Sequence, residues 1–231
     1  MSEVFVVARA DLEALVPELA LVSGGVLLLL LDAFWPRARR LLTPLAVASV
    51  AAALAALAAA AGGADTVHFG GLIETSALSL AASMIVLVAA LLAIFASDGY
   101  LRREQLAGGE YHALLLWCAA GLLLMLRARE LLTIFLALEL LSICLYTLAG
   151  YHRRLAIATE AGLKYFLMGA FVSAFVLYGI ALVWGETGHT DLDGISAALA
   201  AGTGHPWLVT LGMLLLVAGF AFKMSLVPFH A

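Results

Sequence analysis

The only two lysines of the chain lie inside long apolar segments, where a charged side chain is costly. Lys164 follows "EAGL" and Lys223 follows "AGFAF", whereas all ten arginines lie at or beyond the ends of such segments. Burying an ionisable group at the centre of a membrane helix costs about 2.5–3.5 kcal/mol on insertion scales. Lysine can lose its proton when it is desolvated, and arginine does not. The placement of lysines within the apolar segments and of arginines at or beyond their ends indicates that the lysines gain and release a proton within an apolar layer.

A carboxylate that could pair with these lysines lies in another apolar segment. Glu139, in "FLALELLSICLY", is about nine residues from either end of its segment, too deep for a short side chain to reach an interface. Glu160 precedes Lys164 by four residues, the favourable order for an ion pair on a helix. Two simpler interpretations remain open, a purely structural Glu139 and a Lys164 that extends to the interface. Glu18 and Asp32 flank the first apolar segment and are expected to anchor it at the interfaces.

The stretch around Lys223 also contains a helix breaker. "AGFAFKMSLVPFHA" places Pro228 after the lysine, and a proline cannot donate the backbone hydrogen bond that the Met224 carbonyl would receive. A helix broken here is expected to admit water or an ion path at mid-membrane. Imidazole titrates near neutral pH, so His230 would suit the passage of protons toward an exit. A plain proline kink, with no role for His230, is the alternative.

The composition indicates an all-α, polytopic transmembrane helix bundle. Of the 231 residues 65% are hydrophobic and 12% are charged, against about 25% charged in soluble domains. The mean hydropathy is +1.08. Seven segments approach the length of about 20 residues that a membrane helix needs; they are 14–34, 41–61, 77–97, 111–127, 130–149, 159–184 and 207–231. We expect the last of them to be broken at Pro228, and the loop 185–206 to add one or two helical turns.

Small and aromatic residues predict how the bundle packs. Gly169 and Ser173 are spaced by four residues, which lets helices approach closely. Tyr146, Tyr165 and Tyr178 are expected to pack within the bundle or to donate hydrogen bonds there.

The arginines predict the orientation of the chain. Seven of the ten follow the first, third and fifth segments, so these loops should be cytoplasmic and the N-terminus external, as in a bacterial inner membrane. The N-terminus lacks the basic region of a signal peptide, and we expect no cleavage.

The net charge of −4 gives no basis for nucleic-acid binding. His112 and His152 lie at segment ends, which argues against haem ligation, and the sequence contains no nucleotide-binding or metal motif.

Three stretches resemble the antiporter-like membrane subunits of respiratory complex I, and the N-type subunits most closely. They are "LALELLSICLYTLAGY", "EAGLKYFLMGAFVSAFVLYGIALVWGETG" and "GFAFKMSLVPFHA". The opening "LVPELALVSGGVLLLLLDAF" is also similar to the first helix of that family. The resemblance implies that Glu139 and Lys223 form a proton-transferring pair. It also implies that Lys164 is a further proton carrier and that His230 lies in the path linking two half-channels.

The resemblance also implies an architecture and an assembly. Members of the family are longer and contain two inverted repeats. We therefore expect 1–231 to be a single membrane domain from the N-terminal part of such a protein, with flanking helices in 1–110 and an incomplete first repeat in 111–231. The implied function is a proton-translocating subunit of NADH:quinone oxidoreductase that carries no redox centre itself. NADH, flavin, iron–sulfur clusters and quinone are expected in partner subunits, and the partners are expected to be other membrane subunits and lipid.

Two alternatives remain open from the sequence. The same buried residues would serve in a subunit of a sodium/proton antiporter or of a membrane-bound hydrogenase complex. A purely structural membrane subunit that braces an assembly is the third possibility.

Overall fold

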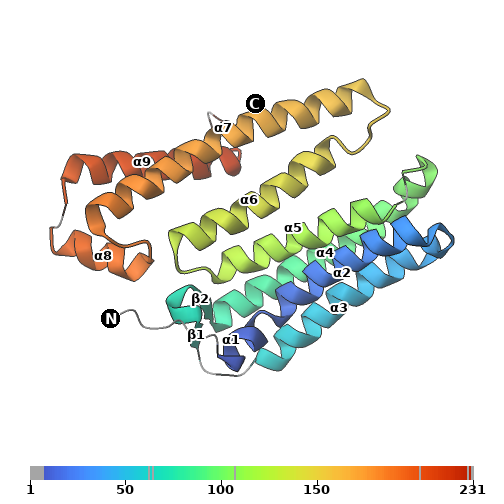
Figure 1. Cartoon of the computed structure of the whole chain (residues 1–231), viewed down its shortest axis with the longest axis horizontal. Coiled ribbons are helices and arrows are strands. Elements are labelled where there is room, and N and C mark those ends of the chain that lie inside the picture. The colour runs from blue at the N-terminus through green and yellow to red at the C-terminus, as the bar shows by residue number, and fades with distance from the viewer. Residues whose placement is uncertain are drawn as a thin grey trace.

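Seven helices that are long and apolar enough to cross a membrane make up most of the part of the chain that the structure describes (Figure 1). The computed structural model describes residues 8–61, 63, 65–106, 108–202, 204–227 and 229. The seven long helices are α2 (Val16–Phe34), α3 (Leu42–Ala60), α4 (Ala77–Arg103), α5 (Gly109–Arg127), α6 (Leu131–Ala149), α7 (Ala156–Thr187) and α9 (Pro206–Lys223). Each of the seven predicted segments corresponds to one of these helices, so the predicted helix bundle is confirmed.

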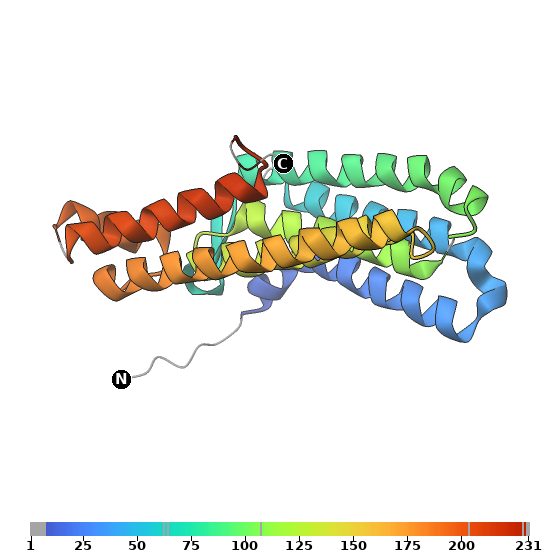
Figure 2. The ribbon, with the colours of Figure 1, turned by 90° about the horizontal axis from the view of Figure 1, so that it is seen from above.

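The helices form two packed groups that α6 connects. Buried side chains of α2, α3, α4 and α5 form one apolar core. A second, smaller core joins α7 and α9 to the start of α6 and to the short helix α8 (Leu192–Ala200). Figure 1 shows α6 between α5 and α7, and Figure 2 shows α9 running beside α7. A side chain in the middle of α6 can therefore face α7 and α9 together.

Short elements gather at one end of the bundle, around the helix α1 (Arg9–Ala14). The 3-10 helix η2 (Phe69–Gly71) connects the strands β1 (Thr66–His68) and β2 (Ile73–Thr75), which form an antiparallel ribbon. The sequence did not predict this ribbon. Another 3-10 helix, η1 (Pro36–Leu41), joins α2 to α3 at the opposite end.

The predicted helical turns in the loop 185–206 are confirmed as α8. Asp191 caps this helix, since its Oδ2 accepts a hydrogen bond from the Gly194 N–H at 2.7 Å. This backbone hydrogen bond lowers the pKa of the Asp191 carboxyl below its usual value.

The end of α9 differs from the prediction of a segment that reaches residue 231. The helix ends at Lys223, and Ser225 then adopts a left-handed conformation with a φ of 52°. The predicted break at Pro228 and the position of His230 lie outside the described residues.

Candidate proton-transfer site

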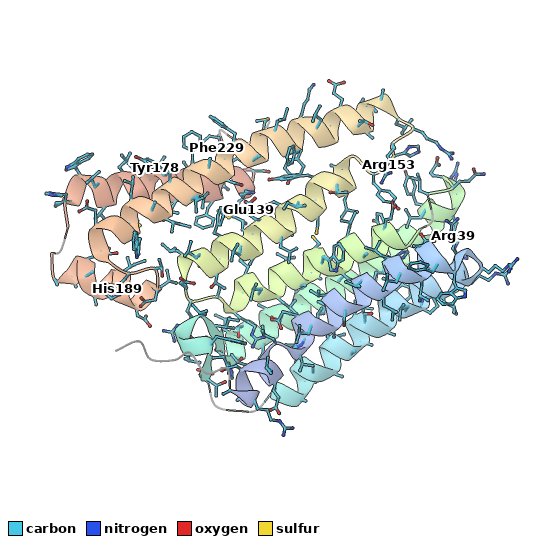
Figure 3. All side chains as sticks on the ribbon, in the orientation of Figure 1. Arg39, Glu139, Arg153, Tyr178, His189 and Phe229 are labelled. Carbon is cyan, nitrogen blue, oxygen red and sulfur yellow. The ribbon has the colours of Figure 1, made fainter. Side chains whose placement is uncertain are left out.

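Lys223 reaches from the end of α9 to three oxygen atoms on α6. Its Nζ donates to Glu139 Oε1 at 3.2 Å, to Ser142 Oγ at 2.7 Å and to Tyr146 Oη at 3.0 Å. An ammonium group has three donors, so each N–H has an acceptor. The side chain of Lys223 is only 9% exposed and that of Glu139 is 23% exposed. Figure 3 shows Glu139 near the middle of α6, which places this ion pair far from both ends of that helix.

The spacing of the acceptors along α6 brings them together. Ser142 and Tyr146 follow Glu139 by three and by seven residues, so the three side chains share one face of the helix. The Ser142 hydroxyl donates to the carbonyl of Leu138 at 2.6 Å. Its lone pairs are then free to accept a hydrogen bond from the ammonium group.

The termination of α9 positions Lys223 at the last residue of the helix. The N–H of Ser225 donates to the Phe222 carbonyl at 2.9 Å. The N–H of Leu226 donates to the Ala221 carbonyl, also at 2.9 Å. With Ser225 in the left-handed conformation, this is the Schellman pattern that satisfies the terminal carbonyls of a helix. The partial negative charge of a helix C-terminus also favours a cation at this position.

Helix α7 supplies the rest of the site's surroundings. Ser173 Oγ lies 2.5 Å from Glu139 Oε1 and 2.9 Å from the carbonyl of Gly169. A Cβ at Gly169 would overlap the hydroxyl of Tyr146, and a Cβ at Gly162 would meet the backbone of Gly150, the C-cap residue of α6. The small residues of α7 therefore allow the close approach that the sequence predicted.

Tyr146 combines packing with hydrogen bonding. Its ring lies edge-on against the ring of Tyr165, with the centroids 4.6 Å apart, and its hydroxyl accepts a hydrogen bond from Lys223. Tyr178, in contrast, is 59% exposed in this chain.

The structure brings together two of the four residues that the sequence singled out for proton transfer. Glu139 and Lys223 are in contact. Lys164 instead forms an ion pair with Glu160 at 2.5 Å, and these side chains are 70% and 62% exposed in this chain. His230 lies outside the described residues, so its predicted place remains a prediction.

The sequence interpretation missed Ser142 and Ser173 and did not assign Tyr146 to the site. Two of the three could have been found, because Ser142 and Tyr146 share a helix face with Glu139. Ser173 lies on another helix, and its position depends on how α7 packs against α6.

A second buried ion pair holds the end of the bundle near α1. Arg127 Nη1 lies 2.8 Å from Glu18 Oε1, and the two side chains are 1% and 9% exposed. Arg127 also donates to the Ala14 carbonyl and to Thr75 Oγ1, each at 2.7 Å. The expectation that Glu18 anchors the interface is wrong, because Glu18 is buried in this pair. Asp32, in contrast, accepts hydrogen bonds from Arg39 and from the Gly109 N–H near the helix ends.

A cavity of about 490 Å³ lies between α2, α5, α6 and α7 and extends toward the end of the bundle that carries most of the arginines. Tyr146 and Thr147 form part of its wall, and Glu110, Tyr151 and Arg153 also border it. Tyr146 therefore both borders this cavity and contacts Lys223. Among the described residues, no group of three or more His, Cys, Asp and Glu side chains could hold a metal ion.

Comparisons with known proteins identify what the chain is similar to. Residues 128–231 match the family described as NADH:quinone oxidoreductase/Mrp antiporter, transmembrane. NADH-quinone oxidoreductase subunit N of Trichlorobacter lovleyi is 38% identical over 222 residues, covering 95% of this chain and 45% of the relative. The same subunit of Xanthomonas euvesicatoria is 39% identical and covers 96% and 45%. The chain thus spans about half the length of these relatives.

Solved structures share the fold. A chain in the structure of respiratory complex I from Thermus thermophilus with bound aureothin matches with a TM-score of 0.75 and 32% identity, covering 93% of this chain and 45% of that one. A chain of the Mrp complex from a Dietzia species matches with a TM-score of 0.71 and 21% identity, covering 95% and 42%. At that lower identity the likeness concerns the fold.

Proposed function

Since the chain belongs to the family of antiporter-like membrane subunits of complex I, we propose that it forms part of a proton-translocating subunit of NADH:quinone oxidoreductase. The observation that carries this proposal is the contact between Glu139 and Lys223 inside a multi-pass helix bundle. Burying an ammonium group in a membrane protein costs free energy even when all its donors have acceptors. A purely structural role gives no reason for this cost, because apolar side chains would pack there without it. A site that gains and loses a proton during turnover would account for that cost.

The proposed step is a change in the separation of Glu139 and Lys223. With the carboxylate at 3.2 Å, the ammonium group has a negatively charged partner. When Glu139 moves away, the ammonium keeps the neutral hydroxyls of Ser142 and Tyr146 but loses the only negative charge that contacts it among the described residues. Desolvation then favours release of the proton. Ser173 holds Glu139 from α7, so a shift of α7 relative to α6 would carry the coupling.

The cavity beside Tyr146 supports a route for protons to this site. It extends from the wall formed by Tyr146 toward Glu110 and Arg153 near the helix ends. Water in that space could reach the tyrosine hydroxyl, which contacts Lys223. We place Lys164 and His230 further along the path, as the family resemblance implies.

The proposal extends to the setting of the protein. The arginine-rich end of the bundle would face the cytoplasm of a bacterium, and the N-terminus would face the periplasm. Flavin, iron–sulfur clusters, NADH and quinone would be bound by partner subunits, to which this chain is coupled by conformational change.

A substitution at Lys223 tests the proposal. In the full-length protein, assembled in its complex and placed in vesicles, Lys223→Met should abolish the proton movement coupled to quinone reduction. Arg154→Met is a matched control, because it also removes a positive charge but lies in a loop outside the spans. Wild-type proton pumping by the Lys223→Met complex would contradict the proposal.

Substitutions at Glu139 test the role of the carboxylate. Glu139→Gln keeps the size of the side chain and removes its charge, and it should reduce proton pumping as strongly as Lys223→Met does. Glu139→Asp keeps the charge and should retain part of the activity. Equal activities of the two variants would show that the charge is not the relevant property.

A subunit of a sodium/proton antiporter complex is the second candidate function. It is favoured by the family model, whose description includes the Mrp antiporter. Sodium-dependent proton exchange in vesicles without NADH oxidation would favour this candidate over the first.

A further inference from the structure

A pocket among arginines lies at the end of the bundle where α4 ends and α5 begins. Its volume is about 180 Å³, about six times the share of liquid volume that one water molecule takes. Arg39 and Arg40 border it from η1, and Arg102 borders it from the end of α4. Three arginines from two separate elements thus border one pocket.

The charges around this pocket are incompletely neutralised. Asp98, which also borders it, pairs with Arg102 at 2.8 Å and accepts a hydrogen bond from Thr43. Among the described residues, Arg39 donates to Asp32 through Nε, and the other nitrogens of its guanidinium have no partner there. Arg40 has no ion-pair partner among the described residues. Three positive charges therefore face two carboxylates, and the pocket carries a net positive charge.

Gly108, before the start of α5, and His112 also border the pocket. Helix α5 begins here at Gly109, and its N-cap residue Gly108 has no side chain to cap the helix. The positive end of the helix dipole lies beside the pocket, and the Asp32 carboxylate already accepts a hydrogen bond from the Gly109 N–H there at 2.9 Å. His112 borders the pocket, is 3% exposed, and its Nε2 has no hydrogen-bond partner among the described residues. Its Nδ1 lies 3.5 Å from the Gly108 carbonyl, and a neutral ring that donates there from Nδ1–H has an unprotonated Nε2, so His112 offers an anion no donor.

The position of the pocket at the ends of membrane helices indicates the occupant. Phosphate diesters of lipids lie at this level of a bilayer, and basic pockets between membrane helices bind anionic headgroups. We propose that Arg39, Arg40 and Arg102 bind the phosphate of an anionic phospholipid such as phosphatidylglycerol. The acyl chains would lie along the exposed apolar side chains near the end of α4, which include Leu92 and Phe95. This proposal does not depend on the proposed proton transfer.

Photochemical labelling of the full-length protein in its purified complex tests the site. Photoreactive phosphatidylglycerol should label chymotryptic peptides from 36–43 and 98–112. Unlabelled phosphatidylglycerol should displace the probe, and phosphatidylcholine should do so poorly. Displacement by millimolar inorganic phosphate as effective as by phosphatidylglycerol would identify a free anion as the occupant and overturn the lipid proposal.

Matched double variants separate this pocket from the general charge of the surface. Arg40→Gln with Arg102→Gln should lower the labelling by about fivefold or more, since each arginine near an anionic surface contributes appreciably to binding. Arg37→Gln with Arg103→Gln removes the same charge from the same two elements without touching the pocket, and it should leave the labelling unchanged. Equal losses in the two double variants would overturn the proposal. If the first variant fails to assemble, Arg40→Gln alone should still lower the labelling, and an unchanged level would count against the site.

Discussion

At the scale of single residues, the ammonium of Lys223 has acceptors of two kinds. Glu139 supplies a negative charge, and Ser142 and Tyr146 supply neutral hydroxyls. The hydroxyls can remain in place when the carboxylate moves, because they accept hydrogen bonds from the charged lysine and Tyr146 can donate one to the neutral amine. They would therefore hold the lysine side chain in one position while its charge changes.

The hydroxyl of Tyr146 can be removed with little change in shape. Tyr146→Phe leaves one N–H of the buried ammonium without an acceptor, so the free energy of unfolding should fall by about 1–3 kcal/mol. Tyr178→Phe is the control, because Tyr178 is exposed in this chain, and its effect should stay within about 0.5 kcal/mol. Titration with a denaturing detergent measures both values, and equal effects would contradict the assigned contact.

At the scale of elements, the site depends on how α7 and α9 meet α6. The apolar segments predicted the helices because their lengths match a bilayer, but they did not predict where α9 ends. That end uses Ser225 in a conformation usually taken by glycine, so the sequence carried no strong stop signal at Lys223. The β1–β2 ribbon was not predicted because its strands are only three residues each, too short to show an alternating pattern in the sequence.

The close packing of α7 on α6 can be tested at Gly169. Gly169→Ala places a Cβ where the Tyr146 hydroxyl lies, so it should destabilise the fold by about 1–3 kcal/mol and reduce proton pumping by displacing Tyr146. Gly185→Ala is a matched control on the same helix, where a Cβ would meet nothing within 4 Å. It should be neutral or stabilising, because alanine favours a helix more than glycine does. Similar effects of the two substitutions would contradict the packing account.

At the scale of the whole molecule, α6 connects the helices α2–α5 to the pair α7 and α9. The residues alone indicated Glu139 as a partner for a buried lysine, and the family resemblance implied that this lysine is Lys223. The burial of Glu18 could not be predicted, because it depends on how the C-terminal end of α5 packs against the β1–β2 ribbon. Arg127, at that end of α5, contacts Glu18 and Thr75 there.

The buried pair near α1 should contribute strongly to the stability of this half of the molecule. Arg127→Met leaves the Glu18 carboxylate buried without its partner, which should lower the free energy of unfolding by about 3–5 kcal/mol. Arg9→Met breaks an exposed pair with Glu13 and should change it by at most about 1 kcal/mol. A change in the free energy of unfolding as small for Arg127→Met as for Arg9→Met would contradict the prediction, and it would mean that water takes the place of the arginine beside Glu18.

In the proposed mechanism, Lys223 works by releasing a proton and not merely by carrying a charge. Lys223→Arg tests this most directly, because arginine keeps the positive charge but does not lose its proton in proteins. The measurement is the number of protons moved per NADH oxidised by the assembled complex in vesicles. The account predicts that the Lys223→Arg complex assembles and that its proton-to-electron ratio falls as it does for Lys223→Met. A wild-type ratio in the Lys223→Arg complex would contradict the account.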